Sequence, residues 1–153
     1  MSDPAATALP TLLLADDDPD DVLLLQRALR RAPVGVSLQI VRDGEQAVQY
    51  LNGQGPYRDR RHFPMPRLLL LDWKLPRRSG LEVLSWIRAR QALDPLPVVI
   101  LSSSGELEDR QQAFAARANS YLQKPAGSQA LQSLVDALLA YWLVYNHAPA
   151  LEP

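Results

Sequence analysis

Residues 68–72 read Leu-Leu-Leu-Leu-Asp, and residues 73–80 continue as Trp-Lys-Leu-Pro-Arg-Arg-Ser-Gly. A short, wholly apolar run bounded by turn residues is typical of a strand that is buried on both faces of a sheet. The carboxyl ends of such strands are where open α/β sheets bind their ligands. Asp72 therefore has two interpretations. It is either a functional carboxylate at the rim of the sheet or a residue that only starts a turn, as Asp often does.

The composition of the chain limits the classes of protein to which it can belong. The 153 residues, 47% of them hydrophobic and 22% charged, predict one domain with a substantial core. A net charge of −1 argues against nucleic acid as a partner, because binding to it needs a basic surface. The chain has no cysteine, which removes disulfides and thiol chemistry. We expect no membrane span and no signal peptide, and hence a cytoplasmic protein.

Apolar strands and amphipathic helices alternate five times along the chain. Strands are predicted over residues 12–15, 37–41, 68–72, 98–101 and 121–122. Helices are predicted over residues 19–31, 44–51, 80–90, 106–116 and 128–142. Asp18 and Asp43 precede the first two helices and suit their N-caps. This alternation predicts a doubly wound parallel α/β sheet with helices on both faces.

The segments outside this pattern are expected to be irregular. Residues 1–9 are small and polar and predict a flexible N-terminus before a domain that spans residues 10–145. Residues 53–66 form an inserted loop with several arginines, which is interpreted either as a solvated insertion or as a contact with a partner. Residues 146–153 form a C-terminal arm, so no output domain is expected after the last helix.

Polar side chains follow four of the five predicted strands. Asp16 and Asp17 follow the first strand, Asp72 ends the third, Ser102 follows the fourth and Lys124 follows the fifth. These residues can converge, because the carboxyl ends of parallel strands face the same way. Three carboxylates repel one another unless a cation intervenes, and their oxygen atoms suit Mg²⁺. Serine and lysine can bind phosphate oxygen atoms, and an aspartate can form an acyl phosphate.

Four blocks of the sequence, in this order, resemble the receiver domain of two-component response regulators. They read LLLADDDPDD over 12–21, LLLLDWKLPRRSGLEVL over 68–84, PVVILS over 97–102 and YLQKP over 121–125. The resemblance extends over roughly residues 11–140. It implies a flavodoxin-like, doubly wound sheet of five parallel strands in the order 2-1-3-4-5, with helices on both faces.

The resemblance also implies a metal site around the phosphoacceptor. Asp72 would accept the phosphoryl group and would bind Mg²⁺ together with Asp17. Asp16 would bind the ion at least through water. The backbone carbonyl group of Lys74 would complete the protein ligands. The Lys74 side chain stands where many relatives carry asparagine or a smaller residue, and it either alters access to the site or simply faces solvent.

Three further roles follow from the same resemblance. Lys124 would bind the phosphoryl group, and the peptide bond between Lys124 and Pro125 is expected to be cis. Ser102 would be the switch hydroxyl residue and Tyr121 the rotameric switch aromatic. Arg117 stands where relatives commonly have glycine after the fourth helix, which puts the left-handed geometry of that turn in question.

The implied function is that of a single-domain response regulator. It would accept a phosphoryl group from a histidine kinase in a Mg²⁺-dependent reaction and signal to a protein partner by a conformational change. It would catalyse only its own phosphorylation and dephosphorylation and would not otherwise be an enzyme. The Asp-Pro-Asp-Asp segment at 18–21, the long loop 53–66 and the Tyr-Trp pair at 141–142 resemble small response regulators that partner phytochrome-type histidine kinases.

The last predicted helix is apolar over more of its circumference than one packed face needs. Its apolar residues are Leu131, Leu134, Val135, Leu138, Leu139, Leu143 and Val144. A surplus of this kind often marks an interface. We therefore expect a homodimer through the fourth or fifth helix and the C-terminal arm.

Three other functions compete with this interpretation. Asp16 and Asp18 form the Asp-x-Asp of a haloacid-dehalogenase-like phosphohydrolase, but Pro19 and Asp20 do not fit that family's pattern. A flavodoxin-like cofactor carrier would need a phosphate-cradling loop after the first strand, where three aspartates would repel a phosphate. A receiver that only binds partners without being phosphorylated would not need the intact acidic set.

Overall fold

The computed structural model describes residues 8–151, so all but the end of the predicted flexible N-terminus, residues 1–9, lies outside the described residues. Within them, five parallel strands form one sheet in the order β2-β1-β3-β4-β5. The strands are β1 (Thr11–Ala15), β2 (Ser37–Val41), β3 (Leu68–Leu71), β4 (Val98–Ser102) and β5 (Ser120–Gln123). The predicted fold and strand order are confirmed.

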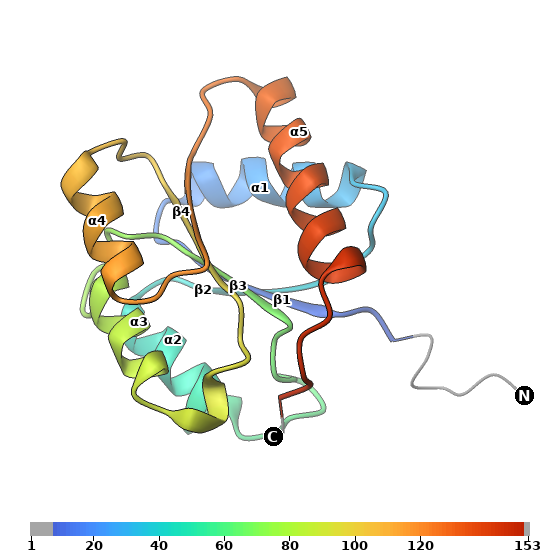
Figure 1. The fold of residues 1–153 in the computed structure, drawn as a ribbon. Coiled ribbons are helices and arrows are strands. Elements are labelled where there is room, and N and C mark those ends of the chain that lie inside the picture. The colour runs from blue at the N-terminus through green and yellow to red at the C-terminus, as the bar shows by residue number, and fades with distance from the viewer. Residues whose placement is uncertain (1–7, 152–153) are drawn as a thin grey trace, which may run out of the picture.

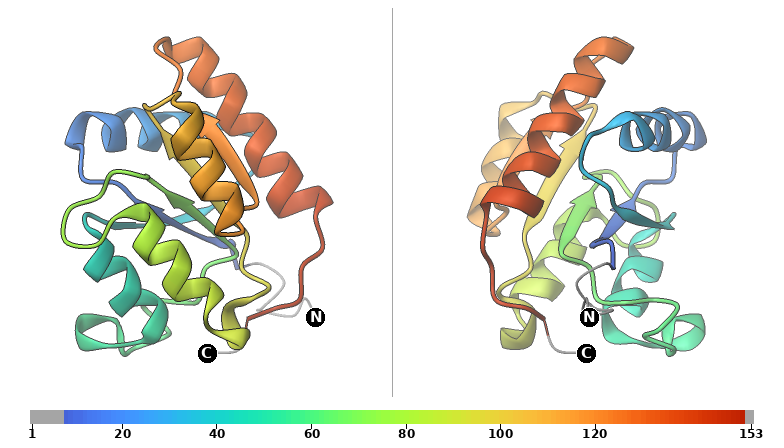
Figure 2. Two further views of the ribbon diagram at one scale, coloured as in Figure 1. Left: turned by 60° about the vertical axis from the view of Figure 1, so that its left-hand side comes forward. Right: turned by 90° about the vertical axis from the view of Figure 1, so that its right-hand side faces the viewer.

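Helices cover both faces of this sheet (Figure 1). They are α1 (Pro19–Arg31), α2 (Gly44–Asn52), α3 (Gly80–Arg88), α4 (Leu107–Ala115) and α5 (Ser128–Leu139). Helices α1 and α5 lie together on one face, and α2, α3 and α4 lie on the other (Figure 2). The last helix was expected to reach residue 142, but it is α-helical only to Leu139 and continues as a wider π-helical segment, Ala140–Tyr145.

Strand β3 is the centre of the core. All four of its leucines have no solvent exposure. Leu69 and Leu71 pack with the residues of α2 and α3, whereas Leu68 and Leu70 pack with those of α1 and α5. A strand with apolar residues on both faces must be covered on both sides, which explains why its sequence does not alternate. Asp72 follows directly and is therefore carried by a fully buried strand.

The first two helices begin at the predicted caps. The Asp18 carboxylate accepts hydrogen bonds from the amides of Asp20 and Asp21, at 2.9 and 3.5 Å. The Asp43 carboxylate accepts one from the Gln46 amide at 2.7 Å. Such caps satisfy amide groups that have no partner inside the helix. Asp18 thus points to its own helix, as a cap rather than as the second acid of a phosphohydrolase.

The loop formed by residues 53–66 is packed against the domain and is not a simple solvated insertion. It contains a short 3₁₀ helix, Gly55–Tyr57. The Arg60 guanidinium donates hydrogen bonds to the carbonyl oxygens of Tyr50, Leu51 and Phe63 at 2.8, 3.0 and 3.1 Å. Tyr57 packs on Tyr50 with 5.1 Å between ring centroids. Arg60 therefore caps the C-terminal end of α2, where carbonyl groups need donors.

Arg117 keeps the left-handed geometry that the sequence put in question. Its φ angle is +70°, and its amide donates a hydrogen bond to the Phe114 carbonyl oxygen at 3.0 Å. A non-glycine residue pays a steric cost in this conformation. Two hydrogen bonds to Arg88 oppose that cost: the Arg88 Nε donates to the Arg117 carbonyl at 3.0 Å, and the Arg117 guanidinium donates to the Arg88 carbonyl at 2.8 Å.

The prediction of a cis peptide bond between Lys124 and Pro125 is wrong, because no peptide bond between residues 8 and 151 is cis. The trans form is the more stable one even before proline, by about 0.5–1 kcal/mol. The Lys124 amide donates a hydrogen bond to the Ser102 carbonyl oxygen at 2.7 Å. The lysine thus continues the pairing of β4 with β5 by one residue.

The described part of the C-terminal arm folds back on the domain. After the π-helical segment, residues 146–151 run past the end of the sheet opposite the carboxyl ends of the strands (Figure 1). Leu151 packs against the core cluster that contains α2 and α3. Among residues 8–151, no helix combines the length and the apolar character that crossing a bilayer requires.

Candidate functional site

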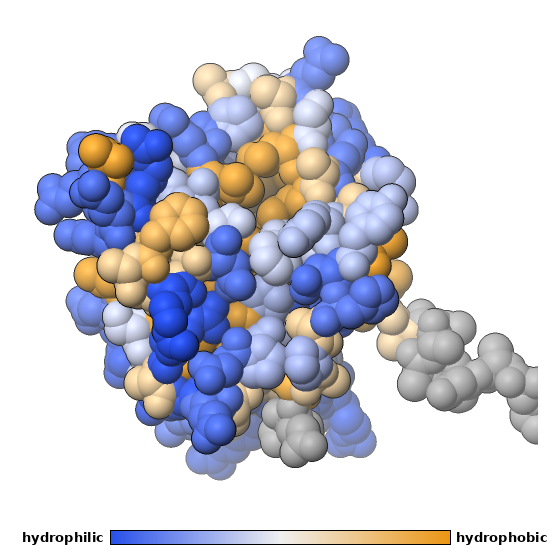
Figure 3. Space-filling model, viewed as in Figure 1, coloured by the Kyte–Doolittle hydropathy of each residue, from blue (hydrophilic) through white to orange (hydrophobic). Residues whose placement is uncertain are grey.

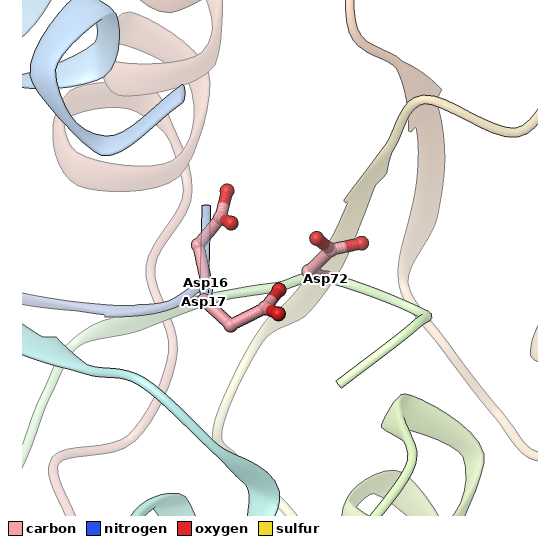
Figure 4. A group of neighbouring side chains, drawn as sticks. All are labelled: Asp16, Asp17 and Asp72. Atoms are coloured by element: carbon pink, nitrogen blue, oxygen red, sulfur yellow. The ribbon is translucent and has the colours of Figure 1, made fainter. Parts of the chain in front are cut away.

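Three carboxylates meet at the carboxyl ends of the two central strands (Figure 4). Asp16 and Asp17 follow β1, and Asp72 follows β3. One oxygen atom of each lies within 4.8 Å of the corresponding atoms of the other two. Asp16 is almost fully buried at 1% exposure and Asp72 is buried at 9%, whereas Asp17 is exposed. The cluster is thus open to solvent on the side of Asp17.

The backbone of the sheet fixes the position of this cluster. The Asp16 amide donates to the Val41 carbonyl oxygen and the Asp72 amide to the Ala15 carbonyl oxygen, both at 3.0 Å. The hydrogen bonds between neighbouring strands therefore extend past the strand ends to Asp16 and Asp72 themselves. Asp16 also accepts a hydrogen bond from the Asp18 amide at 3.0 Å. The backbones of Asp16 and Asp72 cannot separate without breaking the pairing of β1 with its neighbours.

Lys124 enters the cluster from the end of β5. Its ammonium group lies 2.8 Å from an Asp16 oxygen, 2.9 Å from an Asp21 oxygen and 3.3 Å from an Asp72 oxygen. Its side chain is only 11% exposed. An ammonium group has three donors, and here each faces a different carboxylate. The sequence prediction that the ends of β1, β3 and β5 converge is confirmed by these distances.

Asp21 is the one member of this group that the sequence analysis did not select. It lies in the first turn of α1, where acidic residues are common because they suit the helix dipole. Its neighbour Asp20 occupies the same turn and is exposed. The sequence alone could not distinguish Asp20 from Asp21, because only the fold shows which of them faces Lys124 at the end of β5.

Burial and charge shift the acidity of the site in opposite ways. Burial raises the pKa of Asp72, and nearby Asp16 raises it further, whereas the Lys124 charge and the Lys74 amide lower it. Burial alone would lower the pKa of Lys124, but hydrogen bonds to Asp16 and Asp21 and the charge of Asp72 outweigh it and raise that pKa. Lys124 therefore stays charged, and the site holds one fixed positive charge among four carboxylates.

The arrangement of the three clustered acids fits a small divalent cation. Mg²⁺ binds oxygen at about 2.1 Å in octahedral geometry, so two of its ligand atoms lie about 3 to 4 Å apart. Oxygen atoms that already lie within 4.8 Å of one another need only small side-chain rotations to reach this spacing. The ligands are all carboxylates, which is the donor type that Mg²⁺, Mn²⁺ and Ca²⁺ prefer.

The two proposed switch residues surround the loop that follows β4. Ser102 is 1% exposed, and its hydroxyl accepts a hydrogen bond from the Ser104 amide at 3.2 Å. The Tyr121 hydroxyl donates to the Ser104 carbonyl oxygen at 2.8 Å. Both residues therefore hold Ser104, although neither is hydrogen-bonded to Asp72 in the described structure. The loop links the acidic site to the surface of α4.

The loop between β3 and α3 borders the site on its other side. The Lys74 amide lies 3.4 Å from an Asp72 oxygen, and the Lys74 side chain is exposed. The loop is held against the start of α2. The Gly44 amide donates to the Pro76 carbonyl oxygen at 3.2 Å, and Arg78 forms an ion pair with Glu45 at 2.7 Å.

Gly44 permits this contact because it has no side chain. A Cβ atom at this position would overlap the carbonyl oxygen of Arg78. Glycine is the residue that allows two backbones to approach this closely. Helix α2 therefore supports the loop that follows Asp72, although it contributes no group to the acidic cluster.

Comparison with known proteins gives one consistent result. Residues 12–136 match the response regulator receiver domain. The probable methanogenesis regulatory protein FilR2 of Methanothrix harundinacea is 35% identical over 139 residues, which are 90% of this chain and 86% of that protein. Response regulator Rcp1 of Synechocystis is 34% identical over 139 residues, 91% of this chain and 92% of Rcp1.

Solved structures agree with these sequence relationships. The phosphorylated cyanobacterial phytochrome response regulator RcpA superposes with a TM-score of 0.86 at 33% identity, covering 94% of this chain and 100% of RcpA. The Mn²⁺-bound form of Rcp1 gives a TM-score of 0.83 at 33% identity, covering 92% of this chain and 99% of that one. The fold, the acidic cluster and these relatives lead to the same conclusion. The chain belongs to the response regulator receiver domain family.

Proposed function

We propose that this protein is a response regulator in which Asp72 accepts a phosphoryl group from a histidine kinase in the cytoplasm. The observation that carries the proposal is the position of the Lys124 ammonium group, 3.3 Å from an oxygen of a buried aspartate that itself adjoins two further carboxylates. A fixed cation beside a buried carboxylate is what transfer of a phosphoryl group to that carboxylate requires.

The chemistry follows from the groups present. A carboxylate oxygen of Asp72 attacks the phosphorus atom, the bond from phosphorus to the donor breaks, and an acyl phosphate forms. A divalent cation held by Asp16, Asp17, Asp72 and the Lys74 carbonyl would neutralise phosphoryl oxygen charge when bound. Lys124 would bind a phosphoryl oxygen directly. Hydrolysis of the acyl phosphate by water returns the protein to its starting state.

The new group would act on the partner-binding surface through Ser102 and Tyr121. A phosphoryl group adds about −1.5 to −2 charges and three acceptor oxygen atoms. The Ser102 hydroxyl can exchange its bond with the Ser104 amide for one to the phosphoryl group. Tyr121 is hydrogen-bonded to the same residue, so movement of the loop after β4 would change its position. A bias of a few kcal/mol between two such arrangements is enough for signalling.

The proposal is tested with Mg²⁺ and acetyl phosphate. Wild-type protein is expected to gain one phosphoryl group by intact mass, and Asp72→Asn none, because the amide nitrogen is not a nucleophile. Beryllofluoride is expected to change the fluorescence of wild type but not of the variant, because Trp73 is buried next to Asp72.

Asp59→Asn serves as the matched control. Asp59 lies in the loop 53–66 and contacts Arg61 and His62, away from the acidic cluster. This variant should be phosphorylated as wild type is. Asp72 is not the phosphoacceptor if Asp72→Asn gains a phosphoryl group at the wild-type level, or if the wild-type protein gains none.

The kinase is proposed to be of the phytochrome type. This rests on the similarity to RcpA, which is a phytochrome response regulator, over 94% of this chain. Phosphoryl transfer from a phytochrome-type histidine kinase should exceed transfer from an unrelated histidine kinase at equal concentration, and equal transfer would remove this part of the proposal.

The protein is further proposed to form a homodimer through α4 or α5 and the C-terminal arm. An apolar strip runs between α4 and α5 over the edge strand β5 (Figure 3). The residues of this strip that line a groove include Leu122, Leu134, Leu138 and Tyr141. Tyr141 is 55% exposed, and Tyr145 beyond it is 74% exposed. A second copy of the chain would cover this surface.

Sedimentation velocity at about 100 μM is the direct test, because weak dimers have micromolar dissociation constants. The wild-type protein is expected to sediment as a dimer in at least one of two conditions, with or without beryllofluoride, and Tyr141→Glu as a monomer in both. Leu23→Glu, which changes an exposed leucine of α1, provides the control. A wild-type monomer under both conditions would disprove the dimer.

A further inference from the structure

Lys124 has more carboxylate partners than the proposed reaction needs. Its bonds to Asp16 and Asp72 join it to residues that cluster in the candidate metal site. Its bond to Asp21, at 2.9 Å, joins it to a residue outside that cluster. This third bond is shorter than the one to Asp72, at 3.3 Å. Asp21 therefore holds the lysine from the side that faces α1.

The three partners differ in what else they can bind. A divalent cation shared by Asp16 and Asp72 would compete with Lys124 for the negative charge of these two carboxylates, and it would repel the ammonium group. Asp21 is not one of the three clustered carboxylates, and it lies in the first turn of α1. It is therefore the carboxylate that can keep Lys124 in place when the other two are occupied.

We propose that Asp21 is a positioning residue that holds the Lys124 ammonium group at the phosphoryl site while a divalent cation occupies the acidic cluster. The proposal rests on the proposed function in assigning Lys124 to the phosphoryl group. Its physical basis is the charge-assisted hydrogen bond from a side chain that is 11% exposed to one that is 32% exposed. Such a bond orders a long, flexible side chain that would otherwise sample many rotamers.

The chain offers an unusually direct test, because Lys74 and Lys124 are its only lysines. Brief acetylation with acetic anhydride, read by peptide mass spectrometry, gives the ratio of Lys124 to Lys74 labelling. Lys74 is exposed and serves as the internal reference. Asp21→Asn should raise this ratio about three- to tenfold, because loss of one charge-assisted hydrogen bond frees the amine. The increase should be larger with Mg²⁺ than with a chelator.

Asp20→Asn is the matched control. Asp20 lies in the same helical turn, its removal changes the net charge and the helix-dipole interaction equally, and it makes no contact with Lys124 among the described residues. Asp20→Asn should leave the labelling ratio unchanged. Asp21→Glu, which keeps the charge on a longer side chain, should restore at least part of the protection.

A kinetic measurement separates positioning from a general structural effect. Asp21→Asn should slow phosphorylation of Asp72 by acetyl phosphate about three- to tenfold in the wild-type background, and much less in a Lys124→Gln background, because Asp21 acts through the lysine. Equal labelling in Asp21→Asn and Asp20→Asn would overturn the proposal, as would an undiminished slowing in the Lys124→Gln background. Failure of the proposed function would look different, since wild-type protein would then not be phosphorylated while the labelling result would stand.

Discussion

Replacing Lys124 with glutamine is expected to lower the free energy of unfolding by about 3 kcal/mol at pH 7 in the presence of a chelator. Among residues 8–151, the substitution removes the only cation that contacts Asp16 and Asp72, which are 1% and 9% exposed. Two buried carboxylates would then repel each other without compensation. Urea denaturation of the wild-type protein and the variant measures the difference.

The loss of stability in Lys124→Gln should depend on pH in a defined direction. Burial already raises the pKa of Asp72 above its value in the unfolded chain, and removal of Lys124 raises it further. A carboxyl group with a raised pKa in the folded state makes the folded protein less stable as pH rises from the unfolded pKa through the folded one. The destabilisation of Lys124→Gln should therefore shrink as pH falls toward 4 and Asp72 becomes protonated.

Magnesium should act in the same direction as acid. A divalent cation between the carboxylates replaces the missing positive charge, so saturating Mg²⁺ is expected to recover more than half of the lost stability. Lys74→Gln provides the control, because Lys74 carries the same charge on an exposed side chain. If the two variants are equally stable in the presence of a chelator, Lys124 does not compensate the charge of the buried carboxylates.

A second large effect is expected from Gly44→Ala, at a position that lies outside the acidic cluster. The added Cβ atom would overlap the Arg78 carbonyl oxygen, so the loop between β3 and α3 must move away from α2. Overpacking against backbone costs about 2–3 kcal/mol, which exceeds the gain of at most about 1 kcal/mol from replacing glycine in a helix. The same movement would displace Lys74 and slow phosphorylation of Asp72.

Gly127→Ala is the matched comparison for this substitution. Gly127 precedes α5, and apart from its two chain neighbours no residue in the described range 8–151 has an atom within 4 Å of the position that its Cβ would occupy. Its φ angle of −98° suits alanine, so this variant should lose less than about 1 kcal/mol, from the poorer N-cap. Thermal unfolding and the rate of phosphorylation by acetyl phosphate check both variants. If Gly44→Ala and Gly127→Ala have similar melting temperatures and phosphorylation rates, the close contact between Gly44 and Arg78 does not limit either property.

The sequence predicted the sheet because its strands are short, apolar and bounded by turns. The run of leucines in β3 favoured a strand that is covered on both faces of a sheet, and the structure places it there. The acidic cluster followed from the same pattern, since the parallel strands that carry Asp16 and Asp72 have to end at one edge. These predictions depend only on the direction of the strands.

Features that depend on the exact approach of two elements could not be predicted. Asp21 and Asp20 are equivalent in sequence, and only the tilt of α1 against β5 decides which of them meets Lys124. The sequence showed Arg60 only as one of several arginines in a basic loop, yet its side chain caps α2 with two hydrogen bonds and donates a third to the loop carbonyl of Phe63. Whether Arg117 could adopt a left-handed conformation depended on Arg88, which lies 29 residues away in the chain.

The ion pair between Lys124 and Asp16 joins residues that are 108 positions apart. Contacts of such long sequence separation require the closure of a large loop. Strand β5 lies at the edge of the sheet opposite β2 and is joined to β3 only through β4, so Lys124 reaches Asp72 only when β3, β4 and β5 are all in place. A nascent or partly folded chain thus presents Asp72 without its lysine. Competence to receive a signal would therefore arise only when the last strand has docked.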